Sequence, residues 1–281
     1  MSQLIVLRQR IRAIETIRKI THAMQLISMS SHSRLRQKKT FIEHYRKAIS
    51  SVWCKLIACT PDWQASLTPL LPQKLIIVIG AQKGLAGNFN TQLIRFFQQE
   101  VPSLDGATRL ITVGKHLTHQ LTQAHLSIGA SYTNFTLNHL SSLADLLARD
   151  IINHRYNSVI VYSSYSKTFF LQKQKKTTVI PYEHEIAANA CTPIDCVEYS
   201  WEQGKHDIIK TLMHLNLNAL LLDLLFDSLL AEQAARFISM ESATRNAQNL
   251  LNEMRLEYNK RRQARITLEL TDLATSSFGQ R

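Results

Sequence analysis

The sequence predicts an α/β protein: a long antiparallel coiled coil of N- and C-terminal helices, plus a central α/β domain with a mostly parallel sheet. The first observation is that all 6 prolines and 7 of the 8 glycines lie between Pro61 and Gly204. Gly and Pro are the strongest helix breakers, so the flanking segments can each form a nearly uninterrupted helix. The second is a heptad pattern in both flanks. We expect three parts: a helix at 1–60, an α/β domain at 61–204 and a helix at 205–281.

The N-terminal segment carries apolar residues at coiled-coil spacing. Leu35, Ile42, Ile49 and Leu56 recur every seven residues, and earlier positions alternate steps of three and four. At 1.5 Å per residue, the two terminal helices would be roughly 85 and 105 Å long. That length disfavours the simpler alternative, in which each segment is an amphipathic helix on a globular core.

The C-terminal segment has a similar pattern and pairs naturally with the first helix. Since a domain separates the two helices in the sequence, they would pack most simply antiparallel. The apolar stretch 215–230 contains Asp223 and Asp227 and is shorter than the ~20 residues of a membrane span, so a membrane helix is not expected. The chain start also lacks the pattern of a signal peptide. The seven-residue series comprises Leu212, Ala219, Phe226, Gln233, Met240, Ala247 and Met254.

The middle of the chain alternates short apolar runs with helical stretches. This order implies βαβ crossovers and a parallel sheet covered by helices. Residues 168–180 are typical of a hairpin, with Lys173, Lys175 and Lys176 in a solvated turn. Residues 181–204 are expected to be an irregular segment that leads back to the C-terminal helix. The expected strands are 74–79, 109–113 and 158–162, and the expected helices are 91–100, 115–126 and 140–154.

The charge is concentrated at one end. The whole chain carries +12, and residues 1–60 hold 12 basic and 2 acidic side chains, whereas residues 201–281 are neutral overall. A basic balance indicates an anionic partner, such as nucleic acid, a membrane surface or an acidic protein patch, without choosing among them.

A glycine-rich turn, Gly80-Ala-Gln-Lys-Gly-Leu-Ala-Gly87, follows the first strand and precedes a helix. Backbone N–H groups at such a position can bind phosphate. The spacing is not G-x-G-x-x-G, and no Gly-Lys-Ser/Thr ending is present. A tight turn that uses glycine's conformational freedom is the favoured interpretation, and a nucleotide-dependent enzyme is the weaker alternative.

No catalytic or metal-binding constellation stands out. The 4 cysteines form two pairs with four intervening residues, which is not zinc-ligand spacing. His116 and His119 could share a helix face, but no nucleophile or carboxylate accompanies them in sequence. We therefore expect no catalytic residue, no cofactor and no metal, and a structural or coupling role.

Both ends of the chain resemble signatures of the γ subunit of F-type ATP synthases. These are residues 11–24 near the N-terminus, and residues 230–247 and 258–270 near the C-terminus. Residues 84–90, Gly-Leu-Ala-Gly-Asn-Phe-Asn, resemble the family's glycine turn. The likeness covers effectively the whole chain, and its C-terminal motifs are highly specific.

The resemblance implies a rotor that does no bond chemistry. In this family the helix pair turns inside a hexamer of alternating α and β subunits, while the α/β domain contacts the ε subunit and the c-subunit ring. Proton flow turns the shaft and drives ATP synthesis, or hydrolysis in reverse, at the β subunits. An acidic β loop would be attracted by the basic N-terminal segment. The resemblance further implies a peripheral position on the cytoplasmic side of a bacterial inner membrane.

By similarity, nine residues are expected to contact the αβ hexamer. Their alternative interpretation is ordinary solvated helix faces. They are Lys19, Thr21, Met24, Glu232, Gln233, Arg236, Arg262, Gln263 and Thr267.

The sequence departs from the family in places. Residues 28–34 are serine-rich, Ala86 and Asn88 replace the usual Cys and Gly of the turn, and Asp223 and Asp227 are unusual. The sequence leaves open whether the chain belongs to a main or to a second, paralogous ATP synthase. It also leaves open whether the coupling ion is a proton or sodium. The main interpretation expects no nucleic-acid partner. The alternative function is a basic coiled-coil protein that binds nucleic acid, marked by salt-sensitive affinity.

Overall fold

The computed structural model describes residues 2–58, 71–102, 108–154, 156–181 and 205–278. The chain divides into two compact units, one formed by Met1–Ser28 with Phe237–Arg281 and the other by Met29–Arg236. Two long helices, α1 (Ser2–Ala58) and α6 (Lys205–Phe278), contribute residues to both units. The expected boundaries at 60 and 204 lie outside the described residues, so the three-part division stays a prediction.

The first unit is a pair of antiparallel helices. Arg8 of α1 donates a hydrogen bond to Tyr258 of α6 at 2.9 Å, Arg18 bonds to Gln248 at 2.7 Å, and Thr21 bonds to Thr244 at 2.8 Å. The residue numbers of the partners on α6 fall as the residue numbers on α1 rise, so the two helices run antiparallel. The buried side chains of the seam include Leu7, Met240, Ala247 and Leu251. Glu15 and Arg255 add an ion pair across the two helices.

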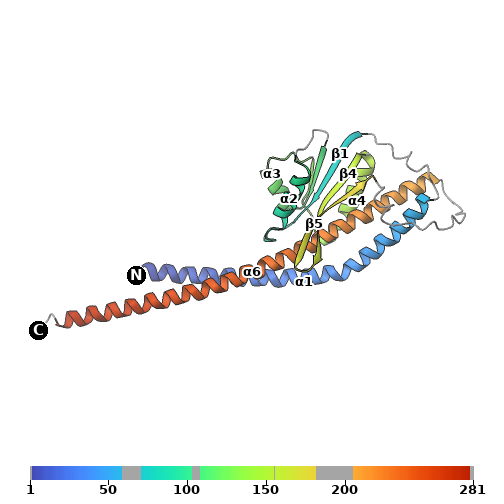
Figure 1. Cartoon of the computed structure of the whole chain (residues 1–281). Helices are drawn as coiled ribbons and strands as arrows, with labels where there is room; N and C mark the ends of the chain where they lie inside the picture. The colour runs from blue at the N-terminus through green and yellow to red at the C-terminus, as the bar shows by residue number, and fades with distance from the viewer. Residues whose placement is uncertain (1, 59–70, 103–107, 155, 182–204, 279–281) are drawn as a thin grey trace. The chain divides into compact units, whose positions relative to one another are not determined.

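The second unit is built on a five-stranded sheet in the order β3-β2-β1-β4-β5 (Figure 1). Strands β1 to β4 pair in parallel, and β5 pairs antiparallel with β4. The mostly parallel α/β fold that the sequence predicts is therefore confirmed. The strands are β1 (Leu71–Ile79), β2 (Thr108–Val113), β3 (Ala130–Tyr132), β4 (Tyr156–Thr168) and β5 (Leu171–Ile180).

Helices cover both faces of this sheet. The helices within the domain are α2 (Phe89–Glu100), α3 (Lys115–Gln123), the 3₁₀ turn η2 (Leu137–His139) and α4 (Leu140–His154). Side chains alternate between the faces of a strand. Ile76 and Val78 of β1 therefore pack with α2 and α3, whereas Leu75, Ile77 and Ile79 pack with α4 and α6. Every one of these five side chains is buried, which explains why β1 is a continuous apolar run.

Three sequence expectations need correction. Lys173, Lys175 and Lys176 lie within β5 rather than in a solvated turn, and the chain reverses between Thr168 and Leu171. Lysines are common on an edge strand because they block pairing with other chains. The short strand β3 was not expected, and α3 ends at Gln123, three residues early. The expected return at 181–204 lies almost entirely outside the described residues.

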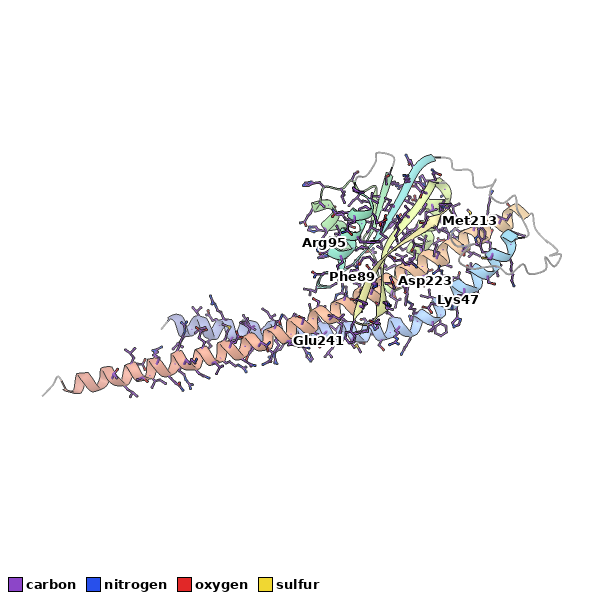
Figure 2. All side chains as sticks on the ribbon, in the orientation of Figure 1. Lys47, Phe89, Arg95, Met213, Asp223 and Glu241 are labelled. Carbon is purple, nitrogen blue, oxygen red and sulfur yellow. The ribbon has the colours of Figure 1, made fainter. Side chains whose placement is uncertain are left out.

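Apolar residues of α6 form much of the core of the second unit. By length and composition Asp207–Thr271 could cross a membrane, but the core helix of a soluble protein meets the same test. Leu217, Leu221 and Leu225 are buried in the cluster that joins α6 to the sheet. Near its start, Met213 packs with Trp53 of α1, and Figure 2 labels Met213 on that part of α6.

Candidate functional site: the glycine turn and α6

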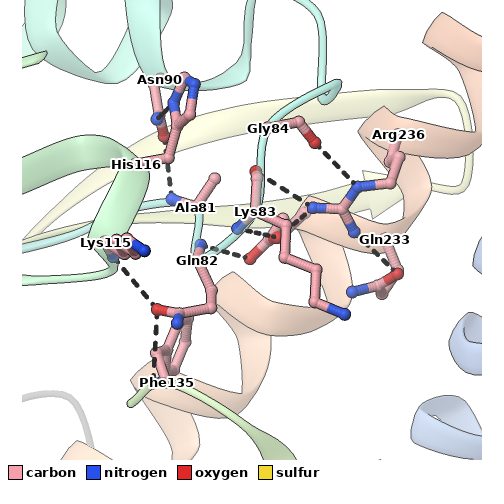
Figure 3. Close-up of polar contacts among 11 residues, drawn as sticks. Ala81, Gln82, Lys83, Gly84, Asn90, Lys115, His116, Phe135, Gln233 and Arg236 are labelled. Atoms are coloured by element: carbon pink, nitrogen blue, oxygen red, sulfur yellow. Dashed lines mark hydrogen bonds and ion pairs between the residues drawn. The ribbon is translucent and has the colours of Figure 1, made fainter. Parts of the chain in front are cut away.

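The turn between β1 and α2 is held by its own domain. The backbone N–H of Gly80 donates to the carbonyl of Val113 at 2.9 Å, and that of Ala81 donates to Asn90 Oδ1 at 2.9 Å (Figure 3). Asn90 in turn contacts His116 Nδ1 at 3.1 Å. Gln82 Oε1 accepts from the backbone of Lys115 and of Phe135. The glycine turn is thus a fixed platform at the end of β1.

Glu232 of α6 is the anion that this platform binds. Its carboxylate accepts hydrogen bonds from the backbone N–H groups of Gln82 at 3.1 Å and Lys83 at 3.2 Å. The residue is only 1% exposed. N–H groups of this kind are the ones that would bind phosphate in a nucleotide site. Because a side chain of the same chain already occupies them, the geometry favours the structural-turn interpretation of the glycines.

Arg236 completes the arrangement one helical turn later. Its guanidinium pairs with the Glu232 carboxylate and donates to the carbonyl oxygens of Lys83 at 3.3 Å and Gly84 at 3.2 Å. It also donates to Gln233 Oε1 at 3.0 Å (Figure 3). Arg236 is 2% exposed. A buried charge needs such a partner and such hydrogen bonds to be tolerated.

A cavity of about 200 Å³ opens beside the turn. Its lining includes the buried apolar side chains of Leu35, Phe135 and Leu229. Exposed Arg34 and Lys83 also line it. Glu232, whose carboxylate is paired with Arg236, lines it as well. The cavity therefore combines an apolar floor with two exposed cationic side chains and one paired carboxylate.

The expected contact residues fall into two groups. Glu232, Gln233 and Arg236 lie together at the glycine turn, although the first and last are buried. The other six lie on the helix pair of the first unit, where Lys19, Arg262, Gln263 and Thr267 are exposed and Thr21 and Met24 are half-buried. Whether any of the nine contacts a partner subunit stays a prediction.

The first unit also has a cavity, of about 320 Å³, lined by residues near the start of α1 and near the end of α6. Arg8, Arg262 and Arg265 line it together with Tyr258, Ile266 and Glu269. The Arg8 guanidinium lies 5.8 Å from the centre of the Tyr258 ring, a cation–π contact. Arg262 is thus the one expected contact residue that borders this cavity.

Sequence reasoning missed the charged pairs between α1 and α6 in the second unit. Lys39 donates to Asp227 at 2.5 Å, and Arg46 donates to Asp223 at 2.6 Å. Burial raises the pKa of Asp227, and the hydrogen bond and charge of Lys39 only partly offset it. Burial alone would lower the pKa of Lys39, but the hydrogen bond and charge of Asp227, together with the charges of Glu43 and Asp223, outweigh it, so that pKa is raised. The sequence did contain a signal for these pairs, because Asp223 and Asp227 lie within a leucine-rich helix and need partners there.

Among the residues that the structure describes, no group of three or more His, Cys, Asp or Glu side chains is placed to hold a metal ion. Cys54 is buried, and the other three cysteines lie outside the described residues. His116 and His119 are exposed on α3.

The fold and this site define a class: coiled-coil proteins whose α/β domain, inserted between two pairing helices, is bonded to the C-terminal one. The ATP synthase family model matches residues 3–277. The chain therefore belongs to the ATP synthase family.

Individual relatives agree with this assignment. The chain is 28% identical to the ATP synthase gamma chain of Caulobacter vibrioides (strain NA1000 / CB15N), over 99% of both chains. It is 29% identical to that of Rickettsia prowazekii (strain Madrid E), over 97% of this chain and 98% of the relative. A chain of the mitochondrial ATP synthase of Euglena gracilis (OSCP/F1/c-ring, rotational state 3) shares the fold, with a TM-score of 0.74 at 15% identity, over 99% of this chain and 95% of that one.

Proposed function

We propose that this chain is the γ subunit of an F-type ATP synthase, the central shaft that couples ion flow through the membrane sector to ATP synthesis or hydrolysis at the β subunits. The observation that carries the proposal is the end-to-end match to curated gamma chains, which covers 97–99% of this chain in the two relatives above. The comparisons support this reading and not the nucleic-acid alternative. The antiparallel helices and the inserted α/β domain suit a stiff shaft.

The proposed partners are the α and β subunits, the ε subunit and the c-subunit ring. The chain itself would perform no bond chemistry, and the complex would place it on the cytoplasmic side of a bacterial inner membrane. The glycine turn supports a non-catalytic role, because Glu232 fills the N–H groups that a nucleotide phosphate would need. The nine residues expected from the resemblance remain the proposed contacts to the αβ hexamer.

The cavity beside the turn is the proposed seat of the acidic β loop. Arg34 and Lys83 offer positive charge at the cavity, and Leu35 and Phe135 offer an apolar floor. Opposite charges raise association rates and fix orientation more than they raise affinity. An acidic loop with one apolar anchor therefore matches both properties of the site.

The direct test mixes the chain with cognate α and β subunits and measures assembly and Mg-ATP hydrolysis. We expect a stable complex whose hydrolysis exceeds that of α and β alone. A parallel titration with DNA at physiological salt serves as the control for the alternative function. Tight DNA binding with no assembly would overturn the proposal.

A further inference from the structure

We infer that Ser228, Glu232 and Arg236 form a latch that fixes α6 to the glycine turn at a single rotational setting, so that helix and turn move as one body. Glu232 and Arg236 act in it as positioning residues.

The latch follows the geometry of one helix face. Residues 228, 232 and 236 are spaced by four and so lie on the same side of α6. Ser228 Oγ donates to the carbonyl of Ile79 at 3.3 Å. Glu232 and Arg236 then bond to the next residues of the turn, up to Gly84. Successive side chains of the helix thus meet successive residues of the turn.

Small side chains bring the helix and the turn together. Ala231 and Ala235 of α6 form a buried cluster with Ala81, Ala86 and Phe89 of the turn and α2. Ala81 is 1% exposed and Ala231 is fully buried. Methyl groups allow the close approach that hydrogen bonds from backbone to side chain require.

The charges make the setting specific. One residue of an α-helix corresponds to a rotation of about 100°. If α6 were rotated by that amount in either direction, Ala231 or Gln233 would lie opposite the N–H groups of the turn in place of Glu232. Both buried charges would then lose their hydrogen bonds, which is strongly unfavourable for an ion pair out of water. The latch therefore resists rotation of α6 within its own domain.

For a rotor, this latch is a point of torque transfer between the α/β domain and the helix. This consequence rests on the proposed function, whereas the latch itself does not. The two are separable by experiment, since one can be measured on the isolated full-length chain and the other on the assembled enzyme.

The first experiment measures amide hydrogen exchange in the isolated chain carrying Glu232→Gln. The Gln carbonyl can accept from one N–H, but its NH₂ group meets the other donor. We expect the amides of Gln82 and Lys83 to exchange about tenfold faster or more than in the wild type. Glu241→Gln is the matched control, because Glu241 pairs with Arg245 on the same helix at an exposed position (Figure 2). Unchanged exchange at Gln82 and Lys83 in Glu232→Gln would overturn the latch.

The second experiment uses Glu232→Ala and added acetate. If the turn is a preformed carboxylate site, acetate should raise the Tm of this variant, or restore its folding, while leaving the Tm of the wild type and of Glu241→Ala unchanged. An equal effect of acetate on all three proteins would contradict a carboxylate site at the turn.

The third experiment reconstitutes Glu232→Gln into the complete ATP synthase and measures protons pumped per ATP hydrolysed. We expect this ratio to fall below that of the wild type and of Glu241→Gln. A wild-type ratio alongside fast exchange at the turn would overturn torque transfer and leave a purely structural latch. Failure of the wild-type chain itself to assemble would count against the proposed function and not against the latch.

Discussion

Arg46 of α1 donates a hydrogen bond to Asp223 of α6 at 2.6 Å, although Asp223 lies in the middle of a leucine-rich stretch and its side chain is only 10% exposed. An aspartate at this position carries a desolvation cost that leucine would not. Its partner makes it useful, because a polar pair within an apolar seam is satisfied in only one alignment of the two helices. Figure 2 labels Asp223 on this part of α6.

Asp223→Ala should therefore destabilise the chain by about 2 kcal/mol, less than for a fully buried pair because Arg46 is partly exposed. A double-mutant cycle with Arg46→Ala should give a coupling energy of about 0.5–3 kcal/mol in urea unfolding. Arg149→Ala is the control, since Arg149 is exposed and its pair with Asp145 on the same helix should contribute under about 1 kcal/mol. Strict additivity of the two main substitutions would show that the pair contributes no specific energy.

His32 predicts a dependence of stability on pH. The residue is buried on α1 and makes an edge contact with the Phe169 ring at 4.8 Å. Burial, and then the charge of Arg36, lower the pKa of His32 from its usual 6.5. The folded state thus prefers the neutral ring. The associated stability is fully present above pH 6.5 and is lost as the pH falls toward the lowered pKa.

The measurement is the Tm between about pH 7.5 and 5.5. His32→Phe keeps an aromatic ring against Phe169 and should flatten the fall in Tm at the acid end. His22→Phe, at an exposed position of the same helix, should retain the wild-type profile. If His32→Phe and the wild type show the same slope, another group controls the acid sensitivity.

Gly114 is required by its backbone conformation. Its φ is +109°, and a Cβ atom there would lie 2.6 Å from the carbonyl oxygen of Gly80. Gly114→Ala should destabilise the domain by roughly 2–4 kcal/mol, since the clash is with backbone and the conformation is strained. Gly84→Ala should cost far less, because its Cβ would meet only the His116 ring, at 3.4 Å. Thermal unfolding of both variants compares them directly, and equal losses would refute the distinction.

Arg262 and Gln263 allow a test of the expected hexamer contacts. Both side chains are exposed on α6, so replacing them together with Ala should change stability by no more than about 0.5 kcal/mol. We expect weaker assembly with cognate α and β subunits, or slower ATP hydrolysis, at an unchanged Tm. Wild-type assembly and turnover would remove both residues from the proposed contacts.

The cavity beside the glycine turn gives a prediction about charge. Reversing it with Arg34→Glu and Lys83→Glu should slow association with the cognate α and β subunits and weaken its salt dependence. Lys38→Glu is the control, because Lys38 is exposed on the same helix but does not line the cavity. If Lys38→Glu slows association equally, the effect is one of overall charge and the cavity is not a specific binding site for the acidic loop.

Elements whose hydrophobic pattern is set by local burial could be predicted from the sequence. β1 is a continuous apolar run because both of its faces are buried, and α4 is amphipathic because only one of its faces is. The predicted bounds of α4, 140–154, match the structure. Strand β3 escaped prediction because three residues, of which none is fully buried, leave no hydrophobic pattern. The lysines of β5 suggested a turn because edge-strand protection and solvated turns use the same residues.

The candidate site was predictable only in part. Glu232 and Arg236 were selected through resemblance, as contacts to other subunits. Their bonds to the glycine turn join residues about 150 positions apart, which periodicity cannot detect. The residue types did carry a signal. Glu232 and Arg236 form a charged pair spaced by four, and the neighbouring small residues Ala231 and Ala235 indicate a helix face that another segment of the chain approaches closely.

The hydrogen bond between Arg8 and Tyr258 spans 250 positions of the sequence. At typical synthesis rates of about 5–20 residues per second, α1 emerges from the ribosome roughly 10–50 s before its partner on α6. Before α6 has been made, the side chains of Leu7, Leu35 and Trp53 have no α6 surface to cover them. Of the two long helices, α1 is thus made first but can gain these native contacts only once α6 has been made.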